Sequence, residues 1–200
     1  MLGPGSMLFI RHAERGQIPE GSDGDEVPLT PRGRADALDF GRRLKSAMGG
    51  AAEGLRAASS PIGRCAETAR LIMEGTGAPA AEIRISRYYL TSYLADADLA
   101  MTALRDVGYE AALHDFIRSG RFPGFESLGE GSKKLIGRLR KSAGGHPLVC
   151  VSHDVVILPF LAHFAPRDIG KLPGGWIGFL EGVLIDPEGG ARYFRPGELA

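Results

Sequence analysis

Residues 7–15 read Met-Leu-Phe-Ile-Arg-His-Ala-Glu-Arg (MLFIRHAER), an apolar run followed at once by charged and imidazole side chains. The apolar part, Met7–Ile10, predicts a short strand that is buried on both faces. The same arrangement recurs at Leu148–Ser152 (LVCVS), which His153 and Asp154 follow. Strands of this kind are typical of a parallel sheet covered by helices, with polar side chains at the strand ends.

Helical segments separate these strands. Thr30 and Pro31 provide an N-cap hydroxyl and a proline at the first helical position, and Gly49 ends that helix. Ser127 and Glu130 match a capping box before another helix. The alternation predicts an α/β fold with a mostly parallel sheet. Further helices are expected over 64–74, 96–107, 110–118 and 155–164, strands over 55–60 and 83–90, and a terminal hairpin of 176–185 and 191–194.

The composition bounds both size and partners. The chain has 200 residues, 44% of them hydrophobic, which suits one domain over residues 7–200. Residues 1–6 form a short, Gly/Pro-rich segment, so we expect this segment to be disordered or non-native, with Met7 as the natural start. Lys and Arg together number 24, as do Asp and Glu. A zero net charge argues against a nucleic-acid binder or a polybasic membrane anchor.

The two cysteines, Cys65 and Cys150, lie in no metal-like or CxxC spacing. A reducing, cytoplasmic setting is therefore expected. No apolar run approaches the roughly 20 residues that a membrane helix needs. No metal and no cofactor are expected, because His114, His146 and His163 do not form a ligand pattern with acidic residues.

Basic side chains follow three of the predicted strands. In open α/β sheets, ligands bind outside the carboxyl ends of the strands, so these residues are expected to converge. Arginine offers planar paired donors that match phosphate oxygens, and a helix start also favours anions. The set predicts a site for one dianionic phosphate group. Its members are Arg11, His12 and Arg15 after the first strand, Arg64 after the second, and His153 and Asp154 after LVCVS.

The residue types also predict a chemistry. A neutral imidazole such as that of His12 is a good nucleophile and accepts a phosphoryl group on nitrogen. Neighbouring arginines lower the pKa of such an imidazole and keep it unprotonated. Cleavage of an ester also needs a general acid for the leaving oxygen, and Asp154 is placed for that role. Asp154 is alternatively the cap of the helix that begins at Val155, and both roles can coexist.

These residues together resemble the histidine phosphatase superfamily, also called phosphoglycerate mutase-like. The resemblance rests on Arg11-His12, on Arg64 within Ser-Pro-x-x-Arg-x-x-x-Thr-Ala, and on His153 after a late strand. Leu-Thr-Pro-x-Gly at 29–33 and Glu-Ser-Leu at 126–128 extend it over nearly the whole chain.

The resemblance implies a three-layer α/β/α fold and a phosphohistidine intermediate. Carried over by position, His12 is the nucleophile, and Arg11, Arg64 and His153 bind the phosphate. Arg15 and Asp154 match the acid phosphatase and phytase branch, where the aspartate donates the proton.

Two positions depart from the family pattern. Ala13 replaces the usual glycine after Arg-His. The mutase branch carries an acidic glutamate after the third strand, but here no carboxylate occurs until Asp96 and Asp98, which are more typical of a helix start. Asp154 is therefore preferred as the acid over Asp96 or Asp98, and phosphoglycerate mutase activity is disfavoured.

The resulting hypothesis is a metal-independent phosphomonoester hydrolase that acts on a small phosphorylated substrate. Two alternatives stay open. One is a phosphoprotein phosphatase acting on phosphohistidine or phosphotyrosine, which requires an open site. The other is a non-catalytic phosphate-binding protein of the same fold, although such a protein would be expected to lose His12, Arg64 or His153.

Overall fold

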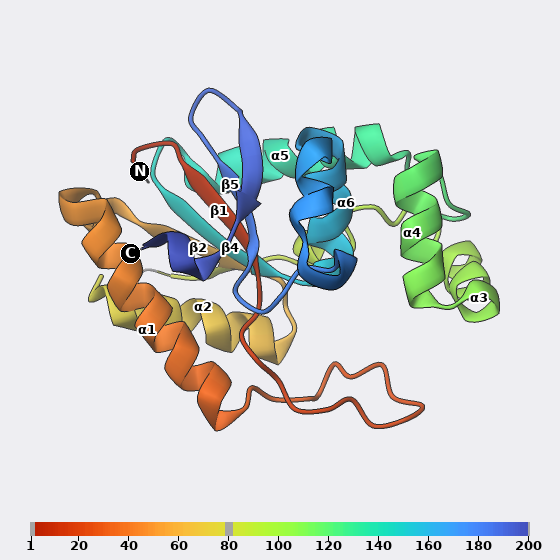
Figure 1. Cartoon of the computed structure of the whole chain (residues 1–200), viewed down its shortest axis with the longest axis horizontal. Coiled ribbons are helices and arrows are strands. Elements are labelled where there is room, and N and C mark those ends of the chain that lie inside the picture. The colour runs from red at the N-terminus through yellow and green to blue at the C-terminus, as the bar shows by residue number, and fades with distance from the viewer. Residues whose placement is uncertain (1–2, 79–81, 200) are drawn as a thin grey trace.

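The computed structural model describes residues 3–78 and 82–199. A six-stranded sheet with the order β3-β2-β4-β1-β5-β6 runs through the middle of the protein (Figure 1). The pairs from β3 to β1 are parallel, whereas β5 and β6 pair antiparallel. The predicted mostly parallel sheet is thus confirmed. The strands are β1 (Met7–Arg11), β2 (Arg56–Ser59), β3 (Arg84–Ile85), β4 (Leu148–Ser152), β5 (Gly182–Ile185) and β6 (Ala191–Phe194).

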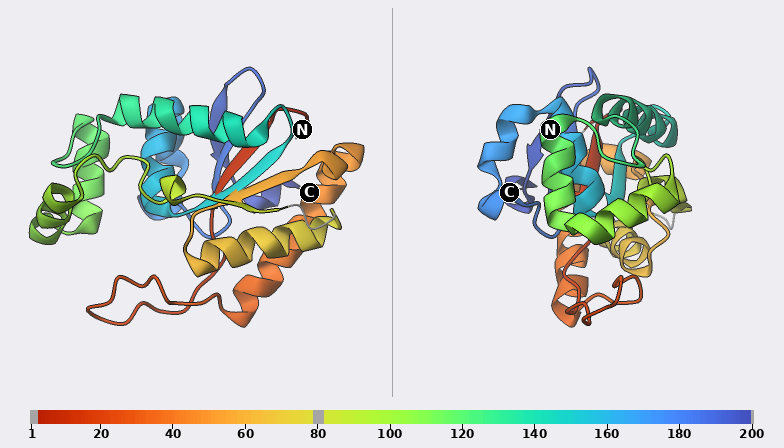
Figure 2. Two further views of the ribbon diagram at one scale, coloured as in Figure 1. Left: turned by 180° about the vertical axis from the view of Figure 1, so that it is seen from behind. Right: turned by 90° about the vertical axis from the view of Figure 1, so that its right-hand side faces the viewer.

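Helices cover both faces of this sheet, so the protein is a three-layer α/β/α sandwich (Figures 1 and 2). Helices α1 and α2 lie on one face, and α5 and α6 lie on the other. Helices α3 and α4 lie together at one end of the molecule, beyond the sheet. The helices are α1 (Pro31–Met48), α2 (Gly63–Thr76), α3 (Ala97–Val107), α4 (Tyr109–Ser119), α5 (Leu128–Ala143) and α6 (Asp154–Phe164).

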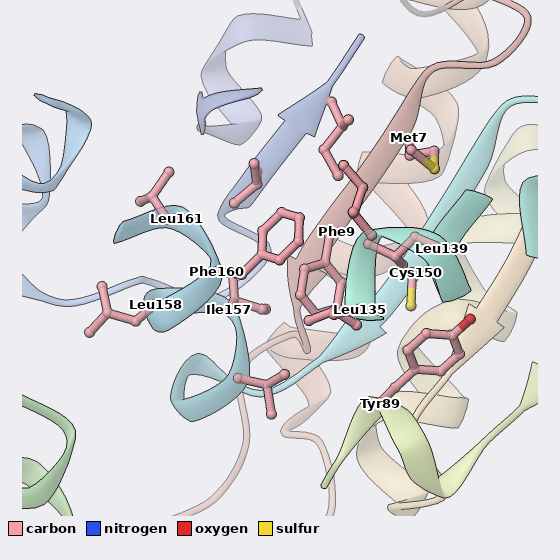
Figure 3. Packing of buried hydrophobic residues seen from close by; sticks show 14 of the residues in the cluster. Met7, Phe9, Tyr89, Leu135, Leu139, Cys150, Ile157, Leu158, Phe160 and Leu161 are labelled. Carbon is pink, nitrogen blue, oxygen red and sulfur yellow. The ribbon is translucent and has the colours of Figure 1, made fainter. Parts of the chain in front are cut away.

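The central strand β1 divides the core in two. Leu8 and Ile10 join the cluster of apolar side chains beneath α1 and α2. Met7 and Phe9 point the other way and join the cluster beneath α5 and α6 (Figure 3). Phe9 packs edge-to-face on Phe160 of α6, with ring centroids 5.6 Å apart. This two-residue alternation explains why the strand reads as a continuous apolar run.

The predicted caps of α1, α3 and α5 are confirmed, whereas the cap position of α6 is His153 and not Asp154. The side chain of Thr30 accepts a hydrogen bond from the Gly33 N–H at 2.9 Å. Ser127 and Asp96 cap α5 and α3 in the same way. These side chains satisfy amide donors that have no partner within the helix, and so fix where each helix begins.

Two predicted boundaries between residues 63 and 90 are wrong. The segment 83–90 forms only a two-residue edge strand, and Arg87–Tyr89 forms a 3-10 turn that the Ser86 side chain caps. Its β-branched and aromatic residues favour a strand, but Ser152 of β4 donates to the Tyr89 carbonyl and keeps it in the turn. Gly75 does not end α2, which continues to Thr76.

Residues 3–6, the part of the N-terminal segment that the structure describes, form a turn. The Ser6 N–H donates to the Gly3 carbonyl at 3.0 Å, and the Ser6 carbonyl accepts from the Leu148 N–H at 3.0 Å. This turn therefore continues the pairing of β1 with β4. None of the helices in residues 3–78 and 82–199 is both long and apolar enough to cross a membrane.

A close contact between two glycines sets the distance between α1 and α2. A Cβ atom on Gly41 would lie 2.2 Å from the Ile72 carbonyl oxygen and 2.9 Å from the Gly75 Cα. We therefore expect Gly41→Ala to destabilise the protein by about 2 kcal/mol or more, because backbone atoms cannot yield as side chains do. Thermal unfolding should show a fall in Tm of about 5 °C.

Gly137→Ala is the matched control for that substitution. Gly137 is exposed on α5 and has open space around it. The same change there should stabilise the protein by about 0.5–1 kcal/mol, since alanine favours a helix. Equal effects of the two substitutions would contradict the proposed close contact.

Candidate active site

The carboxyl ends of β1, β2 and β4 bring the predicted residues to one edge of the sheet. Arg11 pairs with Ser152 at the ends of β1 and β4. Just beyond them, the His12 N–H donates to the Ser152 carbonyl at 3.0 Å. The rings of His12 and His153 consequently lie side by side, with centroids 5.5 Å apart. Arg64 reaches the same place from the first turn of α2.

The contacts of His12 define its tautomer. Its Nδ1 lies 2.8 Å from the Ala13 carbonyl oxygen, and its Nε2 accepts from Arg64 Nε at 3.1 Å. Because a carbonyl only accepts and a guanidinium only donates, Nδ1 carries the proton and Nε2 presents a lone pair. Burial, with smaller contributions from His153 and Arg64, lowers the pKa of His12 to about 2. The ring is therefore neutral near pH 7.

His153 is held in the opposite tautomer. Its Nδ1 faces Arg64 Nη2 at 3.4 Å, and its Nε2 lies 3.1 Å from the hydroxyl of Ser60. Since the guanidinium can only donate, the proton resides on Nε2 and points to Ser60. Burial and then Arg64 lower the pKa of His153 to about 4. Ser60 belongs to the Ser-Pro segment after β2, but no sequence pattern indicates this contact.

The loop of residues 16–29 closes over Arg64. Arg64 Nη1 donates to the carbonyl oxygen of Gly24 at 2.6 Å and to that of Asp25 at 3.4 Å. Burial and the neighbouring Asp23 raise the pKa of Asp25. A phosphate group that binds Arg64 through Nη1 has to replace these two carbonyl oxygens.

Arg11 and Asp154 form an ion pair within the same group of residues. Arg11 Nη2 lies 2.8 Å from Asp154 Oδ2, which also accepts from the indole N–H of Trp176 at 2.7 Å. Arg11 Nη1 donates to the Ile177 carbonyl at 2.7 Å. Both outer nitrogens of Arg11 are thus bound to protein groups. Asp154 also begins α6, and its Oδ1 accepts from the Val155 N–H at 2.9 Å.

Arg15 lies at the margin of this group. Its Nη1 donates to the Gly16 carbonyl at 2.8 Å, and within the described residues no hydrogen bond joins its side chain to either histidine. Burial lowers the pKa of Arg15, and the charge of Arg64 lowers it further. Its charge is therefore close enough to Arg64 to add to an anion site.

The other carboxylates considered from the sequence have structural roles. Asp96 Oδ1 accepts from the Leu99 N–H and caps α3, and Asp98 lies exposed in the first turn of that helix. Within residues 3–78 and 82–199, no group of three metal-ligating side chains comes together. His114 packs on the edge of Trp176, with ring centroids 5.9 Å apart, and thereby connects α4 to the Asp154 side of the site.

A loop at residues 176–181 adds an aromatic side chain that the sequence did not suggest. We predicted a strand from Trp176, but β5 begins only at Gly182. The ring of Phe179 lies 5.7 Å from that of His12, and the Arg11 guanidinium lies 4.5 Å from its centre. The glycines at 174, 175 and 178 are the one signal for a loop in this segment.

Comparisons with known proteins bear on the family and the fold. The family described as "Histidine phosphatase superfamily (branch 1)" matches residues 7–87, a range that includes Arg11, His12, Arg15 and Arg64 but ends before Asp154. No curated protein sequence is significantly similar to the chain.

Solved structures resemble the chain over almost its full length. A phosphoglycerate mutase from Bacillus anthracis str. Sterne superposes with a TM-score of 0.61, at 16% identity over 98% of this chain and 94% of its own. The mycobacterial glucosyl-3-phosphoglycerate phosphatase Rv2419c, solved with inorganic phosphate, has a TM-score of 0.57, at 19% identity over 95% of this chain and 95% of its own. The protein histidine phosphatase SixA, complexed with tungstate, has a TM-score of 0.57, at 14% identity over 98% of this chain and 99% of its own.

The chain has the phosphoglycerate mutase-like fold, as expected from the sequence. The family match over residues 7–87 supports the expected likeness to the histidine phosphatase superfamily.

The two buried histidines should be visible in a pH titration. Their pKa values lie below the ordinary value near 6.5, so the unfolded chain binds protons that the folded chain excludes. The free energy of unfolding is therefore not reduced by these histidines above about pH 7. It falls between pH 6.5 and 4, by about 1.4 kcal/mol per histidine for each pH unit. Nitrogen NMR should find both rings neutral at pH 5.5, with the proton on Nδ1 in His12 and on Nε2 in His153. A midpoint near 6.5 for either ring would contradict this arrangement.

Proposed function

We propose that the protein is a phosphomonoester hydrolase that forms a phosphohistidine on His12. One observation carries this proposal: His12 Nε2 presents its lone pair to the Arg64 guanidinium and belongs to a ring that is neutral near pH 7. A neutral imidazole held beside phosphate-binding donors combines a nucleophile with transition-state stabilisation.

In the first step, the phosphate dianion binds to Arg64, Arg15 and His153, and to Arg11. His12 Nε2 forms a bond to phosphorus, and the bond from phosphorus to the ester oxygen breaks. The proton of a protonated Asp154 goes to the leaving oxygen, which departs as the alcohol.

In the second step, water attacks the phosphorus of the phosphohistidine. The Asp154 carboxylate takes a proton from this water, the new P–O bond forms, and the P–N bond breaks with its electron pair returning to Nε2. Inorganic phosphate leaves, and Asp154 is again protonated for the next turnover.

Asp154 has to exchange partners during this cycle. In the free protein, Oδ2 accepts hydrogen bonds from the Arg11 guanidinium and the Trp176 indole. We propose that a bound dianion draws the Arg11 guanidinium toward its own oxygens. A carboxylate without this partner, next to a dianion, takes up a proton more readily. Trp176 remains as the group that positions Asp154.

Similar proteins support a small phosphorylated substrate. One structural neighbour is a phosphatase solved with inorganic phosphate, and another is a protein histidine phosphatase solved with tungstate, an analogue of phosphate in shape and charge. A phosphorylated protein is the second candidate substrate, favoured by the likeness to SixA. We also propose that the reaction needs no metal and that the protein works in the reducing cytoplasm, where its two buried cysteines stay as free thiols.

Substitution of the proposed nucleophile tests the intermediate. His12→Ala should lower kcat on an aryl phosphate by about a thousandfold or more, because the covalent route is lost. The wild type, quenched in alkali, should carry an acid-labile phosphoryl group on His12 that is absent from the variant. His146→Ala, at an exposed histidine, is the control and should retain full activity. Full activity in His12→Ala would exclude the phosphohistidine route.

The role of Asp154 is tested by the leaving group. Asp154→Asn should lower kcat/KM about a hundredfold or more on an alkyl phosphate, whose alkoxide needs a proton. The loss should be much smaller on p-nitrophenyl phosphate, since nitrophenolate leaves without one. A loss of the same size on both substrates would assign Asp154 a structural role alone.

Metal independence is tested by chelation. Overnight dialysis against EDTA should leave kcat and KM unchanged, because neutral imidazole and guanidinium groups supply the nucleophile and the charge. Loss of activity on dialysis, with recovery on addition of a divalent cation, would refute this part of the proposal.

A further inference from the structure

Large apolar side chains border the proposed phosphate site. Ile18, Val155 and Phe179 are 39%, 36% and 36% exposed. Phe179 lies against His12, Val155 follows Asp154 in the chain, and Ile18 lies beside Gly24, whose carbonyl binds Arg64. We refer to these three residues as the apolar rim. The other large hydrophobic side chains with comparable exposure in the described residues lie on or next to β3, α3 and α4: Ile85, Leu99, Met101, Val107 and Tyr109.

Phe179 has the most direct contact with the site. Its ring lies against the His12 ring, and the Arg11 guanidinium packs on its face. The ring therefore covers one side of the nucleophile and of a proposed phosphate ligand, while its outer part remains open to solvent.

The backbone beside Phe179 is strained. Leu180 has φ of 60°, a conformation that non-glycine residues rarely adopt, and within the described residues no other non-glycine residue has a positive φ. Its N–H donates to the Arg11 carbonyl at 3.2 Å, and its side chain is buried. With this backbone conformation, the Leu180 side chain is buried while that of its neighbour Phe179 is partly exposed.

Val155 and Ile18 extend the rim around the site. Val155 follows Asp154 directly in the first turn of α6. Ile18 lies against Gly24, because a Cβ atom built on Gly24 would come within 2.7 Å of its Cδ1. The carbonyl of Gly24 is the group that Arg64 binds at 2.6 Å. Apolar surface therefore adjoins the proposed acid and the loop that covers Arg64.

We infer that the apolar rim binds the alcohol part of the substrate, and that the preferred substrates are phosphate esters of aromatic or branched apolar alcohols, not of polyols. This inference rests on the proposed function and adds the substrate class. An apolar group gains free energy by leaving water for such a surface, whereas the hydroxyl groups of a sugar would lose hydrogen bonds to water there.

Benzyl phosphate and glycerol 3-phosphate test this preference. Both are esters of primary alcohols, so the leaving groups make similar chemical demands. We expect a kcat/KM for benzyl phosphate at least about tenfold higher, as one buried aromatic ring commonly contributes. Phe179→Ala should reduce this ratio by about fivefold through a higher KM for benzyl phosphate. Tyr109→Ala, at a 58% exposed aromatic residue on α4, is the matched control and should leave the ratio unchanged.

Ile18→Ser provides a second variant on an exposed loop and should also reduce the ratio. A wild-type ratio of one or less, or a ratio that none of the rim substitutions changes, would overturn the inference. Calorimetric titration with benzylphosphonate and methylphosphonate separates it from the proposed function, because these compounds bind without turnover. If benzylphosphonate binds more tightly but no ester is hydrolysed, the proposed hydrolase function is refuted and the binding role of the apolar rim is retained. If the two phosphonates bind equally, the binding role of the apolar rim is refuted.

Discussion

The guanidinium of Arg64 links the two histidine rings, and the rest of the site depends on it. It donates to Nε2 of His12 and faces Nδ1 of His153. A guanidinium has donors and no acceptor, so both of these nitrogens have to be unprotonated. One permanently charged side chain, supplied by the first turn of α2, thus determines where the protons of two rings from different strands reside. Lysine could not do this, because it lacks the planar set of donors.

The orientation of the two histidine rings also depends on neighbouring groups that do not take part in the proposed chemistry. The Ala13 carbonyl and the Ser60 hydroxyl hold the outer nitrogens of the two rings. Ser60 directly follows the end of β2, and Ala13 lies two residues beyond the end of β1. The strand ends are in register because β4 pairs with β1 on one side and with β2 on the other. On the α2 side, Thr68 accepts from the Ala13 N–H and donates to the Arg64 carbonyl. The central sheet and one helix therefore fix the site, while the loop of residues 16–29 covers it.

Much of the architecture follows from local sequence signals. Runs such as Leu148–Val151 have no polar side chain that could face water, so a buried parallel strand is the one arrangement that suits them. A helix cap such as Thr30 depends only on residues close to it in the chain, so it can be predicted from the sequence. The segment 83–90 is different, because its fate depends on a hydrogen bond from Ser152, more than sixty residues away. Propensity alone cannot anticipate such a bond.

The same distinction applies to the site. His12, Arg64 and His153 were predictable because each follows a strand, and the topology rule for parallel sheets brings such residues together. Ser60, Phe179 and the carbonyl of Gly24 were not, because their roles arise from the path of irregular backbone. Phe179 also depends on a positive φ at a leucine, which no sequence rule would assign.

The short edge strand has a consequence for how the protein behaves at high concentration. A sheet edge is a template for pairing with another chain, and long flat edges promote aggregation. β3 contributes only two residues to its edge, one of them Arg84, before the backbone turns away at Arg87–Tyr89. Departure from a regular strand at residues 86–90 thus shortens the surface on which a second sheet could grow, and it helps a fold with a long parallel core to remain dispersed.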